Sequence, residues 1–304
     1  MRGKTIHELL DEYRSNKGPV LDIGKLYFNG IDGLDVYNPT SPFSDKDAEA
    51  LIARVEPRDT EYSHIRFFYK ENNTCKQIPN SPVLPLQDPF WTVIQGELVV
   101  GGVEIIPDAW GHIIAWRTKL YRGASLLRLH HFFDGPLGMK DLRLCETTRR
   151  DIAVFTRPQG AKGGRGKIGF IRIASLNDLS MSIIDQAPLL DIFNDDEWGG
   201  VNQPILLDDG SIGCLGHIAC FSEGNVRHYY PMTFVFNPDT SSHTYPKIIL
   251  ERSDILPGPT KRDDLQDVLF PGGLSFVNGS WALLYLGVSD AECQVCKIRN
   301  PFMK

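Results

Sequence analysis

Short runs in which apolar and polar residues alternate recur along nearly the whole chain after residue 25, and Gly, Pro, Asn and Asp separate them. Alternation with a period of two is typical of β-strands that bury one face. The runs that predict strands are Lys25–Asn29, Ile52–Glu56, Ile65–Tyr69, Thr92–Gln95, Glu97–Ile105, His112–Lys119, Ile152–Arg157, Gly169–Ile173, Pro204–Leu207, Ile212–Cys220, Met232–Asn237 and Lys247–Glu251. Many short strands at regular spacing indicate an all-β sandwich, barrel or propeller.

A hairpin is predicted near the C-terminus, where the apolar runs Leu274–Val277 and Trp281–Leu286 flank Asn278-Gly279. Asn-Gly favours a tight two-residue turn in which both residues have positive φ. A Phe-Pro-Gly-Gly segment leads into the hairpin, and a Gly-x-x-Asp segment places the carboxylate of Asp290 just after the second strand. Single polar residues delivered to strand ends in this way are typical of a propeller that lines a central pocket.

Three similar segments narrow the choice of fold. They are VIQGELVVGGVEI (93–105), ILLDDGSIGCLGHIA (205–219) and LSFVNGSWALLYLGV (274–288). Each reads as a strand, a turn of small residues and a second strand. Units of about 45 to 60 residues along the chain suit five blades of four strands. No linker interrupts the pattern, so we predict an all-β, five-bladed β-propeller formed as a single domain by residues 1–304.

One helix is predicted ahead of the first strand, at about residues 5–15. The segment Thr5–Glu8 has the sequence of a capping box, and an apolar stripe at helical spacing follows it before Gly18-Pro19. The stripe consists of Ile6, Leu9, Leu10 and Tyr13. The glycine-rich stretch 160–166 is expected to be a loop between two strands of one unit, because it lacks the P-loop signature and no helix follows it.

Composition and charge exclude several classes of protein. Among 304 residues, 42% are hydrophobic and 23% are charged, which are ordinary globular values. The net charge of −6 disfavours nucleic-acid binding, which usually needs a basic patch. No apolar run is long enough to span a membrane, and the N-terminal residues lack the apolar core of a signal peptide. We expect a cytoplasmic protein without nucleic-acid or membrane partners. These features are also compatible with a homo-oligomer.

The six cysteines do not have the spacing of a zinc site. They are Cys75, Cys145, Cys214, Cys220, Cys293 and Cys296. The last two lie in a strand-like run, in which one is expected to face the core and the other the solvent. We interpret all six as free thiols and expect neither a metal site nor a bound cofactor.

Polar residues stand at several predicted strand ends, where they would face a common centre. The segments are Val36–Pro39, Arg54–Arg58, Gln87–Phe90, Gly138–Arg143, Phe155–Pro158, Trp198–Pro204, Gly216–His217 and Gly287–Asp290. Each alone has a simple structural explanation, since Asp and Asn before Pro favour turns and Arg in an alternating strand usually faces solvent. Together they supply carboxylates, cations, a histidine and aromatic rings such as Trp91, Trp198, Tyr230 and Phe270. Sugar sites use that mixture.

Several short motifs occur in an order that resembles a known family. In chain order they are Asp88-Pro89, Lys140-Asp141, Arg157-Pro158, Gly199-Gly200, Gly216-His217, Phe270-Pro271-Gly272 and Gly287-x-x-Asp290. Their order and spacing resemble the β-mannoside phosphorylases of glycoside hydrolase family 130. The pattern is closer still to their relatives, the mannosyltransferase/phosphorylases of glycosyltransferase family 108, over nearly the whole chain. This resemblance implies a five-bladed β-propeller with its site in the central cavity, which agrees with the strand pattern.

The resemblance also implies roles for the candidate residues. Asp88 would be the general acid, acting on the glycosidic oxygen through a sugar hydroxyl. The expected sugar-binding residues are Asn38, Arg54 and Asp290, with Phe270 and Tyr230 as further substrate contacts and Arg58 as the alternative to Arg54. The expected phosphate-binding residues are Lys140, Arg157 and His217, with inorganic phosphate as co-substrate.

These roles form a coherent mechanism. An inverting phosphorylase takes its nucleophile from solution, so it needs one acid and a cationic clamp in place of the second carboxylate of an inverting hydrolase. Arg157 would bind phosphate through two hydrogen bonds, Lys140 would add a point charge, and His217 would add a donor near neutral pH. The implied reaction is reversible phosphorolysis of β-mannosides, with a β-1,2 linkage favoured, to α-mannose 1-phosphate. Mannosyl transfer from a nucleotide sugar, as in some relatives, is a further expectation.

Two alternatives stay open at this point. The motif departs from family 130 at Phe90, where an arginine usually follows Asp-Pro. A β-mannosidase that uses water would not require Lys140, Arg157 and His217 to converge. A non-catalytic sugar-binding propeller would keep the aromatic and amide groups but would leave Asp88 away from any glycosidic oxygen.

Overall fold

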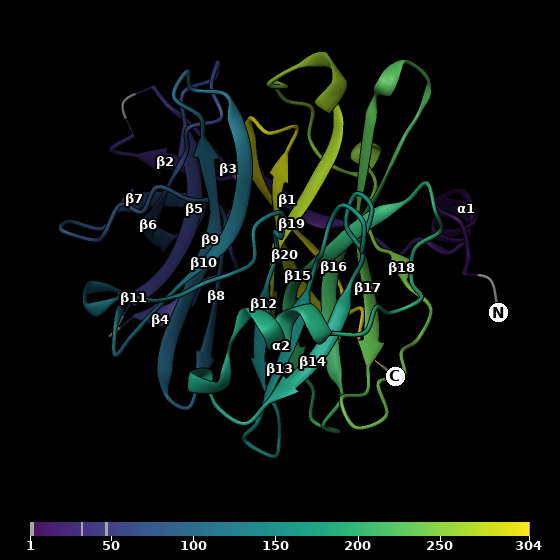
Figure 1. The fold of residues 1–304 in the computed structure, drawn as a ribbon. Coiled ribbons are helices and arrows are strands. Elements are labelled where there is room, and N and C mark those ends of the chain that lie inside the picture. Colours follow the sequence, from purple (N-terminus) through teal and green to yellow (C-terminus); the bar gives the residue numbers. More distant parts are fainter. Residues whose placement is uncertain (1–2, 32, 46–47, 304) are drawn as a thin grey trace.

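The computed structural model describes residues 3–31, 33–45 and 48–303. Most of the regular structure in these residues is β-strand (Figure 1). The α-helices among them are α1 (Ile6–Asn16) and α2 (Met181–Gln186). The hydroxyl of Thr5 accepts a hydrogen bond from the backbone N–H of Glu8, whose side chain accepts one from the N–H of Thr5. The expected all-β protein with a short, capped N-terminal helix is therefore confirmed. No described helix has the length and apolar character that crossing a membrane requires.

Hydrogen bonds join the strands into four sheets. The first contains β2 (Tyr27–Asn29), β3 (Asp35–Tyr37), β4 (Phe43–Asp45), β5 (Ala48–Glu56), β6 (His64–Glu71) and β7 (Thr74–Gln77). The second contains β8 (Gln87–Ile94), β9 (Glu97–Pro107), β10 (Ile113–Gly123) and β11 (His130–Asp134). The third contains β12 (Arg143–Glu146), β13 (Ile152–Thr156) and β14 (Gly169–Ile173). The fourth contains β1 (Leu21–Lys25), β15 (Trp198–Leu206), β16 (Ile212–Phe221), β17 (Arg227–Phe236), β18 (Lys247–Ile248), β19 (Asp267–Phe276), β20 (Trp281–Val288) and β21 (Glu292–Arg299).

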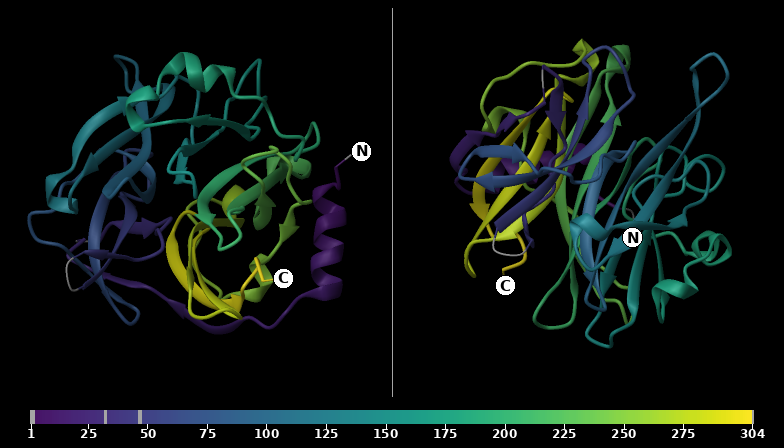
Figure 2. Two further views of the ribbon diagram at one scale, coloured as in Figure 1. Left: turned by 90° about the horizontal axis from the view of Figure 1, so that it is seen from below. Right: turned by 90° about the vertical axis from the view of Figure 1, so that its left-hand side faces the viewer.

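The fourth sheet consists of two antiparallel groups, β15–β18 and β19–β21 with β1. They meet through a short parallel contact between β17 and β19, where Tyr229 lies opposite Val268. Hydrogen bonding alone therefore separates four sheets and does not establish a count of five blades. Strand β1 pairs with β21, with Leu21 opposite Lys297, so the N-terminal strand completes the C-terminal group. Figure 2 (left) shows the groups arranged in chain order around a common centre.

Five buried clusters lie between successive groups of strands. Pairs of residues that share a cluster are Phe67 and Val100, Phe90 and Leu144, Phe155 and Phe234, Leu215 and Leu284, and Tyr285 and Phe68. The last pair joins the C-terminal group back to the first sheet. Because burial of apolar surface is the main stabilising contribution, the packing holds the groups together as a closed ring.

The C-terminal hairpin is present, but its turn differs from the expected one. Residues 277–280 form the connection, and neither Asn278 nor Gly279 has a positive φ. The side-chain oxygen of Asn278 instead accepts hydrogen bonds from the backbone N–H groups of Ser280 (2.9 Å) and Trp281 (3.1 Å). Asparagine therefore acts here through its side chain, as Asn often does in turns, and the predicted two-residue turn was wrong.

All six cysteines are free thiols, as expected. The expectation that Cys293 or Cys296 faces solvent was wrong, because both are buried. Strand β21 is covered on both faces, and each thiol belongs to a different core cluster. The glycine-rich stretch 160–166 does lie between two neighbouring strands, β13 and β14.

Candidate active site

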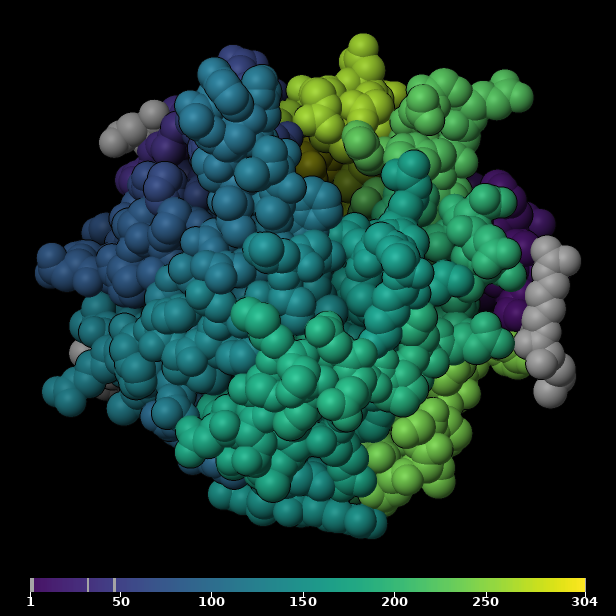
Figure 3. All heavy atoms as spheres, in the orientation of Figure 1, coloured from purple at the N-terminus to yellow at the C-terminus, as the bar shows by residue number. Residues whose placement is uncertain are grey.

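A pocket of 180 Å³ lies where polar strand ends from different sheets meet. The residues expected from the sequence that line it are Asn38, Arg54, Asp88, Lys140, Arg157, His217, Phe270 and Asp290. They come from segments far apart in the sequence, so the ring of strand groups is what brings them together. Figure 3 shows a hollow on this side, between the β9–β10 hairpin and the segment near residue 260.

Two of the expected sugar-binding residues, Arg58 and Tyr230, are not among the residues that line the pocket. The exposed Arg58 pairs instead with Asp35. The hydroxyl of Tyr230 donates to Asp267 (2.8 Å), and its ring belongs to the core cluster beneath α1. Its neighbour Tyr229 lines the pocket, because adjacent strand residues face opposite ways. Both faces of this part of β17 are covered, so strand alternation gave no signal for choosing between the two tyrosines.

Several lining residues were not predicted from the sequence. They are Glu61, Gln87, Asp141, Arg227, Tyr229, Arg262, Leu265 and Val268. Asp141 follows Lys140 in a motif that the sequence did single out, so its position was available as a signal. Glu61 and Arg262 lie outside strands, in segments whose approach to the pocket depends on tertiary structure.

Four polar residues of the pocket share an unusual backbone conformation. The φ angles are 50° for Asn38, 47° for Asp88, 53° for Asp141 and 51° for Asp290. Side chains other than glycine rarely adopt this left-handed region, and Asn and Asp tolerate it best. Conformations of this kind cluster at functional sites, where the surrounding structure holds them in place. All four side chains line the pocket.

The carboxylate of Asp88 is held from one side. Its Oδ1 accepts hydrogen bonds from the amide of Asn38 (2.8 Å) and from Nη1 of Arg54 (3.2 Å). No donor among the described residues contacts Oδ2, which leaves that oxygen available to a substrate. Burial raises the pKa of Asp88, but the charges of Arg54 and Lys140 outweigh it, so the net pKa is lowered. Asp88 is therefore a carboxylate at neutral pH.

Arg54 is fixed by a network on the same wall. Its guanidinium donates to Glu56 (2.8 Å) and Glu61 (3.2 Å) and lies over the ring of Tyr37, 4.8 Å from its centre. Lys261 also reaches this wall and contacts both glutamates. The buried charges of Arg54, Glu56 and Lys261 compensate one another together with the partly exposed Glu61, so Arg54 presents a rigid donor to Asp88.

The lining of the pocket also contains the cations expected to bind phosphate. Nε of Arg157 donates to the carbonyl of Gly199 (2.7 Å), and Nη1 donates to Asp141 (3.1 Å). Asp141 also accepts from Arg143 (2.9 Å), so it orients both guanidinium groups. Lys140 has no ion pair within the described chain. Burial lowers the pKa of Lys140, Asp88 opposes that shift and Arg157 adds to it.

His217 differs from the expectation of a third cation-like donor. Burial, followed by the charge of Arg157, lowers the pKa of His217 to about 3, so the imidazole is neutral at physiological pH. Its Nδ1 contacts the side-chain oxygen of Asn202 (2.8 Å), and its ring stacks on Tyr229 with a 17° angle between the planes. Because an amide oxygen only accepts, Nδ1 carries the proton of the neutral ring, and Nε2 is an uncharged acceptor that can bind phosphate only through a P–O–H group.

Asp290 should make the stability of the fold depend on pH. Burial raises the pKa of Asp290 to about 6; Arg54 opposes this shift and the carboxylate of Asp88 adds to it. The folded protein binds this proton more tightly than the unfolded chain, so stability should be lost as the pH rises from about 4 to 6. Asp290→Asn should remove that loss, worth about 1 kcal/mol after allowance for water in the pocket. Urea unfolding of the wild-type and Asp290→Asn proteins at pH 4.5 and 7.5 tests this prediction. If the free energy of unfolding changes by the same amount between the two pH values in both proteins, the prediction is contradicted.

Glycines allow the Asn38 segment to approach β20 closely. A Cβ on Gly287 would lie 1.8 Å from Oδ1 and 2.7 Å from N of Asn38. Gly287→Ala should therefore displace Asn38 from Asp88, destabilise the fold by about 1–3 kcal/mol and lower activity. A Cβ on Gly279, by contrast, meets nothing within 4 Å, so Gly279→Ala is the matched control. Thermal unfolding and turnover measure both effects; equal results for the two variants would contradict the prediction.

A second chamber of 520 Å³ adjoins the pocket on the side of the cations. Both cavities are lined by Lys140, Arg157, Arg227 and Tyr229. The chamber adds Trp116, Trp198 and Arg165, whose guanidinium lies 5.5 Å from the centre of the Trp198 ring. It therefore continues the site beyond the cations with more positive charge and with aromatic faces.

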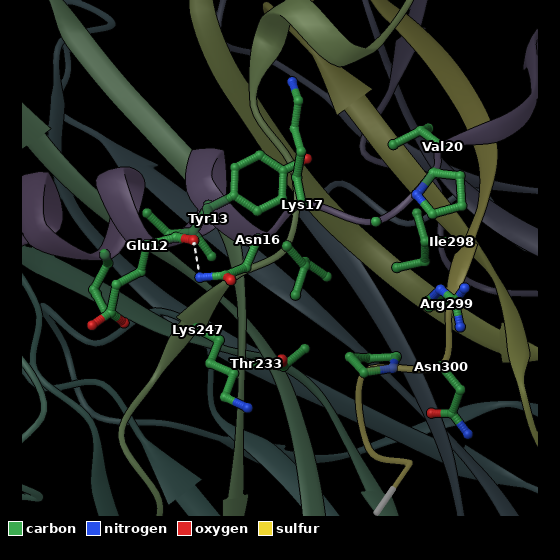
Figure 4. A pocket seen from close by; sticks show the side chains of 16 residues that line it. Glu12, Tyr13, Asn16, Lys17, Val20, Thr233, Lys247, Ile298, Arg299 and Asn300 are labelled. Carbon is green, nitrogen blue, oxygen red and sulfur yellow. Dashed lines mark hydrogen bonds between the residues drawn. The ribbon is translucent and has the colours of Figure 1, made fainter.

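Another cavity of 520 Å³ lies far from these residues, between α1, β18 and β21 (Figure 4). There Glu12 pairs with Lys4, and Lys17 pairs with Asp254. The charged residues that line this cavity, Glu12, Lys17, Lys247 and Arg299, are exposed. Because Asp88 and Arg157 are buried, we assign the chemistry to the pocket around Asp88. Within the described ranges, no group of three or more His, Cys, Asp or Glu side chains is arranged to hold a metal ion.

Comparison with solved structures gives close matches over the whole chain. MPT-4, a mannose phosphorylase from Leishmania mexicana solved in complex with a phosphate ion, is 33% identical, with a TM-score of 0.91 and coverage of 98% of this chain and 93% of that chain. MPT-1, a GDP-Man-dependent mannosyltransferase from Leishmania mexicana, is 32% identical, with a TM-score of 0.89 and coverage of 98% and 95%. A structure from the GH130 family of mannoside phosphorylases is 11% identical, with a TM-score of 0.63 and coverage of 89% and 88%, a likeness of fold alone. No curated protein sequence matches.

Fold, pocket and comparisons together define a carbohydrate-active enzyme of the glycosyltransferase and glycoside phosphorylase class. The resemblance expected from the sequence motifs is confirmed. The chain belongs to the family described as proteins of unknown function, DUF1861, whose model matches residues 12–304.

Proposed function

We propose that this protein catalyses the reversible, inverting phosphorolysis of β-mannosides, with β-1,2-linked oligosaccharides as substrates and α-mannose 1-phosphate as product. The observation that carries the proposal is the convergence of the carboxylate of Asp88 with Lys140, Arg157 and His217 in a single pocket. We also infer that the five groups of strands, joined in a ring by five core clusters, are five propeller blades.

Each wall of the pocket has a part in this mechanism. In its protonated form, Asp88 would donate a proton toward the leaving sugar, through a hydroxyl of the bound mannose, and Arg54 and Asn38 hold its side chain in place. Arg157 and Lys140 would bind the attacking phosphate, with neutral His217 as a further hydrogen-bonding group. Asp290 and Phe270 would contact the mannose ring. In the synthetic direction, the carboxylate of Asp88 would accept the proton of the acceptor hydroxyl.

The two alternatives fit these contacts less well. A β-mannosidase that uses water has no need for buried, convergent cations beside its site. A sugar-binding propeller without activity does not explain why Asp88 is held on one oxygen while the other faces the pocket. The phosphate complex of the 33% identical mannose phosphorylase MPT-4 supports phosphate as the co-substrate.

Mannosyl transfer from a nucleotide sugar is a second candidate, and the chamber beyond the cations favours it. A substituent on the bound phosphate would extend from Lys140 and Arg157 into this chamber, where Arg165 could meet a second phosphate and Trp116 a base. The 32% identical relative MPT-1 depends on GDP-Man.

One assay tests both candidates. The protein is incubated with β-1,2-mannobiose, with and without inorganic phosphate, and mannose 1-phosphate is measured. Phosphorolysis predicts this product only when phosphate is present. Release of free mannose at a rate indifferent to phosphate would overturn the proposal in favour of hydrolysis. A parallel incubation with GDP-mannose and mannobiose reports the transferase activity.

A further inference from the structure

An exposed tryptophan is held rigidly at the tip of the β9–β10 hairpin. Trp110 is 83% exposed, more than the other large hydrophobic side chains of the described chain. Its turn is ordered by Asp108, whose Oδ1 accepts hydrogen bonds from the backbone N–H groups of Trp110 and His112, both at 2.9 Å. The N–H of Asp108 in turn donates to the carbonyl of His112 (2.8 Å). Trp110 is therefore presented to solvent on a fixed turn.

The hairpin tip is attached to the rim of the pocket. The hydroxyl of Tyr62 donates to the carbonyl of Gly111 (2.8 Å), and Tyr62 itself is 46% exposed. The preceding residue, Glu61, lines the pocket, and its carbonyl accepts a hydrogen bond from Gln87, which also lines it (2.8 Å). Figure 3 shows this hairpin on one side of the hollow. Trp110 and Tyr62 thus belong to the mouth of the site.

The chemistry of the pocket indicates which part of a substrate points toward the hairpin tip. In an inverting displacement, the nucleophile and the leaving group lie on opposite sides of the anomeric carbon. Lys140 and Arg157 mark the side of the nucleophile, and the acid Asp88 marks the side of the leaving sugar. Asp88 is joined through Arg54 to Glu61, and so to Tyr62. The leaving part of an oligosaccharide should therefore emerge toward the hairpin tip.

We propose that Trp110 and Tyr62 form a platform that binds the sugar units of a β-mannoside beyond the linkage that is cleaved. The proposal rests on the proposed function and adds a specificity for chains longer than a disaccharide. A pocket of 180 Å³ leaves those further units outside. Aromatic faces pack on the C–H faces of sugar rings, and the adjacent pair of Glu61 with Arg262 (3.1 Å) offers an acceptor and donors for hydroxyl groups.

The test compares β-mannooligosaccharides of two, three and four units as substrates for phosphorolysis. Trp110→Ala should lower kcat/KM for the longer substrates more than for mannobiose. The ratio of kcat/KM for the tetrasaccharide to kcat/KM for mannobiose should fall about 2- to 10-fold. Trp110→Phe should restore part of the ratio, because it keeps an aromatic face. Tyr27→Ala is the control, since Tyr27 is 62% exposed on β2 and lines neither the pocket nor the chamber.

A second measurement keeps the test independent of turnover. If the wild-type protein does not cleave these substrates, the proposed reaction fails, and binding of the tetrasaccharide by calorimetry then tests the platform alone. Binding to Asp88→Asn protein that weakens on adding Trp110→Ala would support the platform. If Trp110→Ala changes neither the ratio of kcat/KM values nor the binding of the tetrasaccharide, the proposed platform is overturned. A shift from oligomer to monomer in Trp110→Ala protein, on a hairpin that also exposes Ile114, would overturn it in favour of a subunit contact.

Discussion

Asp88→Asn should reduce phosphorolysis of mannobiose by about 100- to 10,000-fold, the range that a general acid contributes, while the protein remains folded. Asparagine has nearly the same shape and tolerates the positive φ of this position, so the backbone need not move. The change removes the ionisable proton and leaves the neighbours Asn38 and Arg54 in place. Initial rates and circular dichroism of both proteins measure the two expectations.

The nature of the leaving group separates an acid from a merely structural residue. An aryl β-mannoside with a good leaving group needs little proton donation, so Asp88→Asn should retain far more of its activity on that substrate. The control is Asp35→Asn, which removes a carboxylate that pairs with Arg58 outside the pocket. Full activity of Asp88→Asn on mannobiose, or an equal loss on both substrates, would remove Asp88 from the acid role.

Lys140→Met should raise the KM for inorganic phosphate about 10- to 100-fold, because it removes a charge-assisted contact while keeping the length of the side chain. The KM for mannobiose should change much less. Lys247→Met, at an exposed lysine outside the pocket, is the matched control. An unchanged dependence on phosphate would exclude Lys140 from the clamp.

The same variant should shift the pH profile of the synthetic direction. Lys140 is one of the charges that lower the pKa of Asp88. Without it, the pKa of Asp88 rises, and the carboxylate that accepts a proton from the acceptor hydroxyl forms only at higher pH. The acidic limb of the synthetic rate should therefore move upward, whereas phosphorolysis, which needs the protonated acid, should extend to higher pH. Loss of phosphate affinity without any change in these profiles would show that Lys140 does not act on Asp88.

The strand content could be predicted because alternation of apolar and polar residues is a local pattern. The site residues Asn38, Asp88 and Asp290 were predicted instead from the order of short motifs, which resembles a known family, and their positive φ angles were not expected. The number of separate sheets did not follow, since it depends on one short parallel contact between β17 and β19. Likewise, nothing local shows that Cys293 and Cys296 are covered on opposite faces of one strand.

Other site residues required three-dimensional contacts. Tyr229 and Tyr230 are adjacent on a strand buried on both faces, so their sequence could not decide which one lines the pocket. Arg54 and Arg58 were equivalent by spacing, and only the position of Asp35 shows that Arg58 has a partner elsewhere. The neutral state of His217 depends first on its burial and then on the charge of Arg157, which follows strand β13 of another sheet.

The pairing of Leu21 with Lys297 also has a consequence for biosynthesis. Strand β1 is made before every other strand of the ring, yet its partner β21 is the last of them to be made. A contact between residues so far apart in the sequence carries a high loop-closure entropy and forms late. The growing chain therefore exposes an unpaired edge of β1 until β21 has been made, and unpaired strand edges favour aggregation.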